Sequence, residues 1–182
     1  MNIFVSIASY RDVNCNTTLQ SLYRKAMIPE RIFCGILLQN KNQDEDIDLT
    51  KIDYKFHNQI RIIRTNYLNA RGPLYARQFI LDNLYNNEEF YFQIDSHMDF
   101  IDNYDQHLLD QLYMTPCFKK SIITYYPNET LDGEMVSVMS ETIPYIRFPK
   151  IQQIKGILEI PNDLPKRSKY CAAGFFFTYK DI

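Results

Sequence analysis

Hydrophobic and polar residues form alternating blocks along the first hundred positions of the chain. Short apolar runs rich in β-branched and aromatic residues are each followed by a polar cluster, which is typical of buried strands that end in loops. The runs predict strands at 2–8, 32–38, 60–64 and 90–94. Between them, apolar residues recur at helical spacing in 15–27 and again from Pro73 to Leu84.

This order of elements predicts a fold class. Strands that alternate with helices and are apolar throughout indicate an α/β fold, with a mostly parallel central sheet flanked by helices on both faces. Ligands of such sheets bind beyond the carboxyl ends of the strands. Three polar clusters lie at those ends, and we expect them to converge on one cleft: residues 9–12, 39–40 and 95–97.

The second part of the chain is less regular. Its pattern predicts a helix at 105–113, a strand at 121–125, an irregular segment at 127–160 and a last strand at 171–178. The length of 182 residues fits a single domain.

Composition narrows the function classes. The chain has 46% hydrophobic residues, enough for a core, and its 20 basic and 22 acidic residues give a net charge of −2. We therefore expect no nucleic-acid partner and no membrane partner. The apolar run at the N-terminus is too short for a signal peptide. Four cysteines, Cys15, Cys34, Cys117 and Cys171, have no metal-type spacing, and the expectation is reduced thiols in a cytoplasmic protein.

The sharpest chemical signal is Asp95-Ser96-His97, directly after a predicted strand. Side chains two positions apart can project to the same side and hold one cation. A carboxylate oxygen with an imidazole nitrogen suits Mn²⁺ better than Mg²⁺. The alternative is that Asp95 caps the next helix and His97 is an ordinary polar residue.

A second candidate is the predicted helix start at Arg71, Gly72 and Pro73. Unpaired backbone N–H groups there can bind an anion, Gly72 permits close approach, and Arg77 lies one turn on and could add donors to a diphosphate. An ordinary solvated helix start is the alternative.

The third candidate is the loop of Ser9, Tyr10, Arg11 and Asp12. Tyr10 could pack against a nucleobase and Asp12 could accept from its N–H. A plain loop with a helix-capping acid explains these residues equally well.

Other titratable residues have simpler interpretations. We expect His57 and His107 at the surface. The acidic stretch of Asp99, Asp102 and Asp105 is interpreted as helix-starting and solvated, with Asp99 as a candidate for supporting the metal ligands.

Several blocks of sequence match a known family. IFVSIASYRD, TLQSLYRKA, PERIFCGI, ARGPLYAR and above all YFQIDSHMDF resemble the N-acetylglucosaminyltransferases that modify hydroxyproline on cytoplasmic protein acceptors. The resemblance runs from Ile3 to the CAAGFFF segment. That family is similar in turn to the polypeptide N-acetylgalactosaminyltransferases, which use the same Asp-x-His signature.

The resemblance implies a GT-A fold, a UDP-sugar donor, a divalent cation that is usually Mn²⁺, and transfer with retention of configuration. Asp95 and His97, with Ser96 between them, would hold the metal against the donor diphosphate. The remaining residues would surround the donor: Ser9, Tyr10, Arg11 and Asp12 at the uridine, Arg71, Gly72 and Arg77 at the ribose-diphosphate side, and Ala173 and Gly174 at the sugar.

The same resemblance divides the domain into a nucleotide-binding half, 1–115, and a partial acceptor-side half, 116–182. Family members continue past the CAAGF segment with an acidic motif and a later metal-binding His, and this chain ends before both. Three interpretations follow: a truncated chain, a naturally short paralogue, or a protein that binds donor without transfer. An exposed sheet edge would favour a homo-oligomer.

Three functions remain open at this point. The first is transfer of a sugar, GlcNAc by resemblance, to a hydroxyl of a protein or glycan acceptor. The second is a catalytically reduced UDP-sugar-binding module that acts with a partner. The third is metal-dependent hydrolysis of nucleotide diphosphates, which would need a fuller acidic metal cage than the sequence offers.

Overall fold

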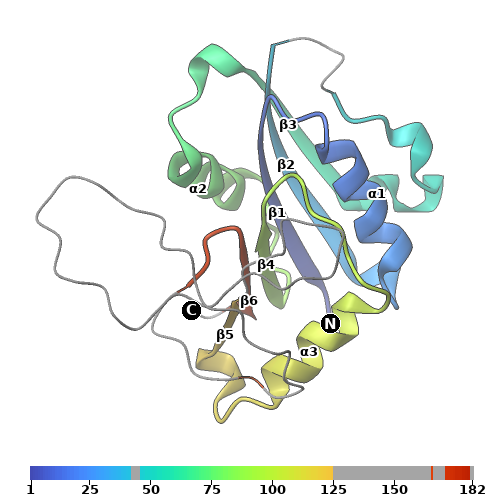
Figure 1. Cartoon of the computed structure of the whole chain (residues 1–182), viewed down its shortest axis with the longest axis vertical. Helices are drawn as coiled ribbons and strands as arrows, with labels where there is room; N and C mark the ends of the chain where they lie inside the picture. Colours follow the sequence, from blue (N-terminus) through green and yellow to red (C-terminus); the bar gives the residue numbers. More distant parts are fainter. Residues whose placement is uncertain (42–45, 125–164, 166–170, 181–182) are drawn as a thin grey trace, which may run out of the picture.

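The architecture is a single sheet with helices on both sides. The computed structural model describes residues 1–41, 46–124, 165 and 171–180. Its six-stranded sheet has the order β3-β2-β1-β4-β6-β5 (Figure 1). The strands are β1 (Ile3–Tyr10), β2 (Ile32–Asn40), β3 (Ile60–Asn66), β4 (Phe90–Ile94), β5 (Ile122–Thr124) and β6 (Phe175–Tyr179).

Strand direction changes on both sides of β6, which runs opposite to the other strands of the sheet. The neighbours β3, β2, β1 and β4 are parallel, whereas β6 runs antiparallel to both β4 and β5. The predicted α/β class with a mostly parallel sheet is therefore confirmed. The antiparallel pairing brings Phe175 opposite Ile94, so the residues just before β6 lie at the carboxyl end of β4.

Helices α1 and α2 lie on opposite faces of the sheet, and α3 crosses its lower end (Figure 1). None of the helices in the described ranges has the length and apolar composition needed to cross a membrane. The helices are α1 (Cys15–Lys25), α2 (Pro73–Leu84) and α3 (Tyr104–Tyr113), with short turns η1 (Pro29–Arg31), η3 (Leu49–Lys51), η4 (Tyr54–Gln59), η5 (Tyr67–Asn69) and η6 (Phe118–Lys120).

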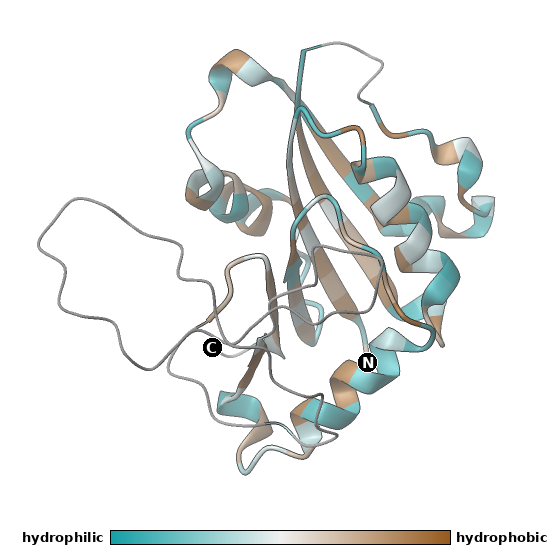
Figure 2. Ribbon diagram, viewed as in Figure 1, coloured by the Kyte–Doolittle hydropathy of each residue, from teal (hydrophilic) through white to brown (hydrophobic). Residues whose placement is uncertain are grey.

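Two apolar clusters fill the two sides of the sheet, and Figure 2 shows the hydrophobic residues concentrated on the strands between the helices. The smaller cluster packs α2 on the sheet through Phe4, Leu37, Ala76 and Ile80. The larger one lies under α1 and α3, and its members include Val5, Leu19, Ile36, Phe92, Leu109 and Phe177. Burial on both faces explains why the strands are apolar throughout rather than alternating.

The sequence located most elements to within a few residues. The last strand begins at Phe175, not at 171, because Ala172 and Gly174 belong to a turn in which the Phe175 N–H donates to the Ala172 carbonyl. The predicted irregular segment at 127–160 lies outside the described residues.

Asp105 corrects one expectation. It is fully buried rather than solvated. Its carboxylate accepts hydrogen bonds from the backbone N–H of Met27 and of Ile28, at 2.6 and 3.1 Å, and from Arg31 Nε at 2.8 Å. Arg31 is itself only 6% exposed. A buried ion pair thus fixes the α1–β2 connection to α3.

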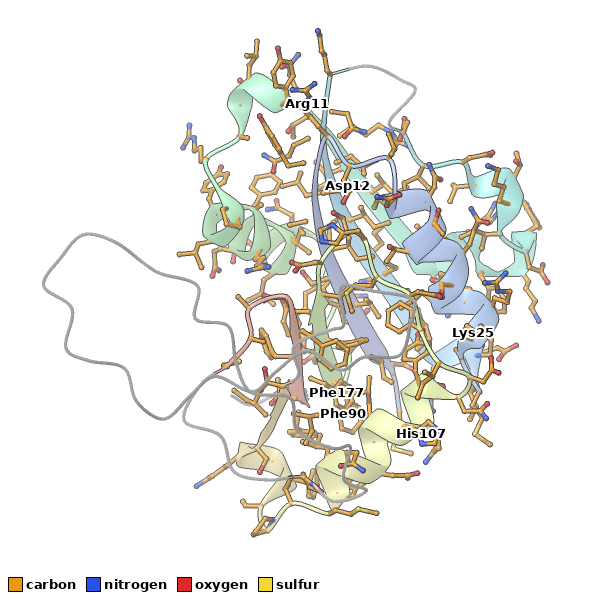
Figure 3. All side chains as sticks on the ribbon, viewed as in Figure 1. Arg11, Asp12, Lys25, Phe90, His107 and Phe177 are labelled. Atoms are coloured by element: carbon orange, nitrogen blue, oxygen red, sulfur yellow. The ribbon has the colours of Figure 1, made fainter. Side chains whose placement is uncertain are left out.

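The remaining titratable groups vary in exposure. His57 is partly buried rather than fully at the surface. Its Nε2 lies within hydrogen-bond distance of the Leu49 and Ile52 carbonyls. His107 is exposed on α3, as expected (Figure 3). The cysteines are all free thiols, and two of them, Cys15 and Cys34, are buried.

Candidate functional site

The loops that follow β1 and β4 meet beyond the carboxyl ends of these neighbouring strands. Asp12, which Figure 3 places just past the end of β1, joins them. Its Oδ2 accepts a hydrogen bond from Ser96 Oγ at 2.6 Å and lies 2.8 Å from His97 Nδ1. Its Oδ1 accepts from the Asn14 N–H at 2.9 Å, in the turn that leads into α1. The polar clusters that follow the first and fourth strands therefore lie in contact with each other.

The protonation state of Asp12 follows from these contacts. Burial raises the pKa of this carboxyl, but the hydrogen bonds from Ser96, His97 and Asn14, with the charge of His97, outweigh burial and lower the pKa below its ordinary value. An ionised Asp12 can only accept, so His97 Nδ1 carries the shared proton. The charge of His97 belongs to the doubly protonated ring, whereas a metal-binding histidine is the neutral ring with its proton on Nδ1 and a lone pair on Nε2.

Side chains of α1 hold the backbone of the loop that follows β4, residues 95–100, in place. The buried Thr18 hydroxyl donates to the Ser96 carbonyl and accepts from the Met98 N–H, both at 2.8 Å. One turn on, Ser21 Oγ accepts from the Phe100 N–H at 3.1 Å and also contacts the carboxylate of Asp99. Nothing in the sequence near Thr18 or Ser21 marks them as part of a site, because both lie on the buried face of a helix.

Asp95 has different neighbours from His97. Its Oδ1 lies 3.0 Å from Nη2 of Arg77 on α2, and its backbone N–H donates to the Gly174 carbonyl at 3.0 Å. A Cβ at position 174 would overlap the Asp95 carboxylate, so glycine is required there unless Asp95 moves. Gln93 Nε2 donates to the Ala173 carbonyl at 2.5 Å. The pair Ala173-Gly174 thus lies against the end of β4.

The chemistry of this donor set fits a divalent metal only in part. Asp95 offers carboxylate oxygens and His97 offers Nε2, a combination that borderline ions accept. Within the described residues, no group of three His, Cys, Asp or Glu side chains is arranged to hold a metal ion. Coordination by Asp95 and His97 together stays a prediction, and it would need further oxygens from a ligand.

A cavity of about 360 Å³ opens beyond the carboxyl ends of β2 and β3. This volume is in the range of small-molecule pockets. Its lining is Leu37, Gln39, Thr65, Leu68, Asn69, Ala70, Arg71, Tyr75 and Phe79. Of the candidate residues from the sequence, Arg71 lines this cavity. Gly72 is next to it with φ 90°, a conformation that favours glycine, and a side chain there would meet no atom within 4 Å.

The loop after β1 approaches the cavity through its backbone. The Arg11 N–H donates to the carbonyl of Gln39 at 3.2 Å, and the Arg11 guanidinium lies 5.1 Å from the ring centroid of Tyr67. Arg11 has a positive φ of 51°, an uncommon conformation for a non-glycine residue. Tyr10 is 54% exposed, whereas Ser9 is fully buried. Their roles at a uridine stay predictions.

Comparison with known protein families identifies the family to which the chain belongs. Residues 2–53 and 48–182 match the family described as "Glycosyltransferase (GlcNAc)". The chain belongs to this family. The match confirms the general part of the resemblance, and the hydroxyproline-specific branch of GlcNAc glycosyltransferases stays a prediction. No curated protein sequence matches the chain.

One solved structure with a TM-score above 0.5 supports the same fold for this GlcNAc glycosyltransferase family member. The mannosyltransferase PcManGT from Pyrobaculum calidifontis, in complex with GDP-Man and Mn²⁺, superposes with a TM-score of 0.51 at 9% identity, over 70% of this chain and 36% of that chain. S. aureus TarS 1-349 in complex with UDP matches at 17% identity with a TM-score of 0.47, over 80% of this chain and 38% of that chain. The chain thus spans little more than a third of these structures.

Proposed function

We propose that this chain binds a UDP-sugar together with a divalent cation at Asp95 and His97, and transfers the sugar to a hydroxyl of a protein or glycan acceptor. The sugar is GlcNAc and the cation is Mn²⁺, as the family membership and the resemblance favour. The observation that supports the proposal best is the Asp12 carboxylate between Ser96 and His97. It engages Nδ1 of His97, two positions after the strand-end residue Asp95, in a fold whose ligands bind at that edge.

The residues around the strand ends have the charges that a diphosphate requires. The Arg77 guanidinium and the amino end of α2 are both positive, and Arg71 adds a second planar fork of donors. A divalent cation held by Asp95 and His97 would supply Lewis-acid stabilisation of the negative charge on a UDP leaving group.

The cavity beside α2 is our proposed nucleoside site. Gln39, Thr65 and Asn69 offer amide and hydroxyl groups that can hydrogen-bond to a pyrimidine edge or a ribose. Tyr75 and Phe79 offer aromatic surface, with ring centroids 6.0 Å apart. This assignment places the base farther toward β3 than the sequence suggested.

Calorimetric titration of the folded chain with UDP tests the proposal, with UMP as the matched control. We expect Mn²⁺ to tighten UDP binding at least tenfold, about 1.4 kcal/mol. We expect little effect of Mn²⁺ on UMP, because UMP lacks the second phosphate that a metal can bridge. Absence of UDP binding in the presence of Mn²⁺, by protein shown to be folded, would contradict the donor site. A transfer assay with UDP-GlcNAc and hydroxyproline peptides then distinguishes an enzyme from a donor-binding module.

Asp12 is expected to act on the metal through His97. Replacing Asp12 by alanine removes the acceptor that orients the imidazole, and partners of this kind are worth about 10- to 100-fold in metal affinity. We therefore expect the Mn²⁺ affinity of the UDP complex to fall by that factor in Asp12→Ala, and by less in Asp12→Asn. Asp110→Ala, an exposed acid on α3, is the control. Unchanged Mn²⁺ affinity in Asp12→Ala would show that His97 needs no such support.

A further inference from the structure

The carboxylate of Asp95 is already in contact with a cation. Arg77 Nη2 lies 3.0 Å from Asp95 Oδ1, and the Arg77 side chain is only 14% exposed. The other oxygen, Oδ2, lies tight against Gly174. Within the described structure, both oxygens of the proposed metal ligand therefore have close neighbours, and one of those neighbours is positively charged.

A guanidinium at this position opposes a metal ion. Arginine does not lose its proton in proteins, so its charge cannot be removed by pH in the working range. A divalent cation that approaches Asp95 must either displace Arg77 or share the carboxylate with it at the cost of repulsion between like charges. Asp95 is 42% exposed, so solvent screens part of this repulsion but leaves the contact in place.

Arg77 also has unused donor capacity. Its Nε is buried and has no hydrogen-bond partner among the described residues. An unpaired buried donor on a charged group is costly, and an anion that reaches it is stabilised accordingly. A diphosphate at the amino-terminal half of α2 would offer such an anion.

We infer that Arg77 is a positioning residue that holds Asp95 in the nucleotide-free chain and makes metal binding depend on the nucleoside diphosphate. When the diphosphate engages the guanidinium, Asp95 becomes available to the cation. The nucleoside diphosphate and the cation then each increase the affinity for the other. This effect adds to the one that comes from direct contact between the cation and the phosphates. This inference rests on the proposed function, because it takes Asp95 as a metal ligand.

The test measures Mn²⁺ binding to the protein without nucleotide. The electron paramagnetic resonance signal of free Mn²⁺ reports how much of the ion remains unbound. We expect Arg77→Met to tighten Mn²⁺ binding about tenfold and to weaken UDP binding measured without metal. Arg77→Lys keeps the positive charge and should stay near the wild type in Mn²⁺ affinity. Arg64→Met is the matched control, since Arg64 is an exposed arginine that pairs with Asp46 and has no ion pair with Asp95 among the described contacts.

A gain of metal affinity on removal of a buried side chain is not what a merely structural role predicts. If folded Arg77→Met, or Arg77→Gln as a second neutral variant, binds Mn²⁺ no tighter than the wild type, the inference is overturned. The donor site itself survives that result if wild-type UDP binding still depends on Mn²⁺. Loss of Mn²⁺ binding by the wild type even with UDP present would instead overturn the metal site, and the role of Arg77 with it.

Discussion

Exchange of Asp95 for alanine is expected to abolish the effect of Mn²⁺ on UDP binding. The variant keeps only His97 as a protein ligand for the cation, and a single imidazole does not hold a divalent ion against water at ordinary concentrations. We expect the affinity for UDP in the presence of Mn²⁺ to fall by the factor that Mn²⁺ contributes in the wild type, at least tenfold or about 1.4 kcal/mol. Paired calorimetric titrations with and without Mn²⁺ measure this difference directly.

The quantity to compare is the Mn²⁺ dependence, not the UDP affinity alone. In Asp95→Ala the guanidinium of Arg77 loses its partner and becomes free to bind the diphosphate, so UDP binding without metal is expected to persist or to tighten. Asp102→Ala, which removes an exposed carboxylate near the same loop, is the control. A variant at position 95 that still responds to Mn²⁺ like the wild type would place the metal elsewhere.

Replacement of Asp105 by alanine is expected to cause the largest loss of stability. The change leaves the Arg31 guanidinium buried without its ion pair and leaves the N–H groups of Met27 and Ile28 without their acceptor. Removal of one partner of a buried pair costs about 3–5 kcal/mol. The free energy of unfolding from urea denaturation should fall by that amount.

The exposed pair of Lys25 and Asp102 provides the comparison. Asp102 is 77% exposed, and Asp102→Ala is expected to cost less than about 1 kcal/mol. The double variant Arg31→Met with Asp105→Leu should recover part of the loss, because it removes both charges instead of stranding one. A fall of under about 1 kcal/mol in Asp105→Ala would mean that water reaches Arg31 when the carboxylate is gone.

The sequence predicted what depends on local pattern. The strand 90–94 was located to the residue, because a polar Glu-Glu pair precedes it and Asp95 ends it. The parallel direction of the first four strands follows from their continuous apolar character, whereas their order in the sheet is not encoded in that pattern. The antiparallel insertion of β6 between β4 and β5 did not, because a run such as Phe175–Thr178 carries no information about direction.

The contacts that define the site depend on distant pairs. Asp105 looked like a helix-starting acid because its partner Arg31 is 74 positions away. Asp12 was predicted to face a nucleobase, and its contacts with Ser96 and His97 span 84 and 85 positions. No spacing rule relates such residues, since only the parallel pairing of β1 with β4 brings them to one edge.

The antiparallel pairing of β6 with β4 has a consequence for synthesis of the chain. A nascent polypeptide that has emerged only as far as β5 contains β1 to β4, but the edge of β4 still lacks its partner, and Asp95 lacks the carbonyl of Gly174. Non-local pairings form late, and an open strand edge is prone to pair with other chains. The edge closes only when residues 175–179 leave the ribosome, so completion of the site and protection from aggregation occur in the same folding step.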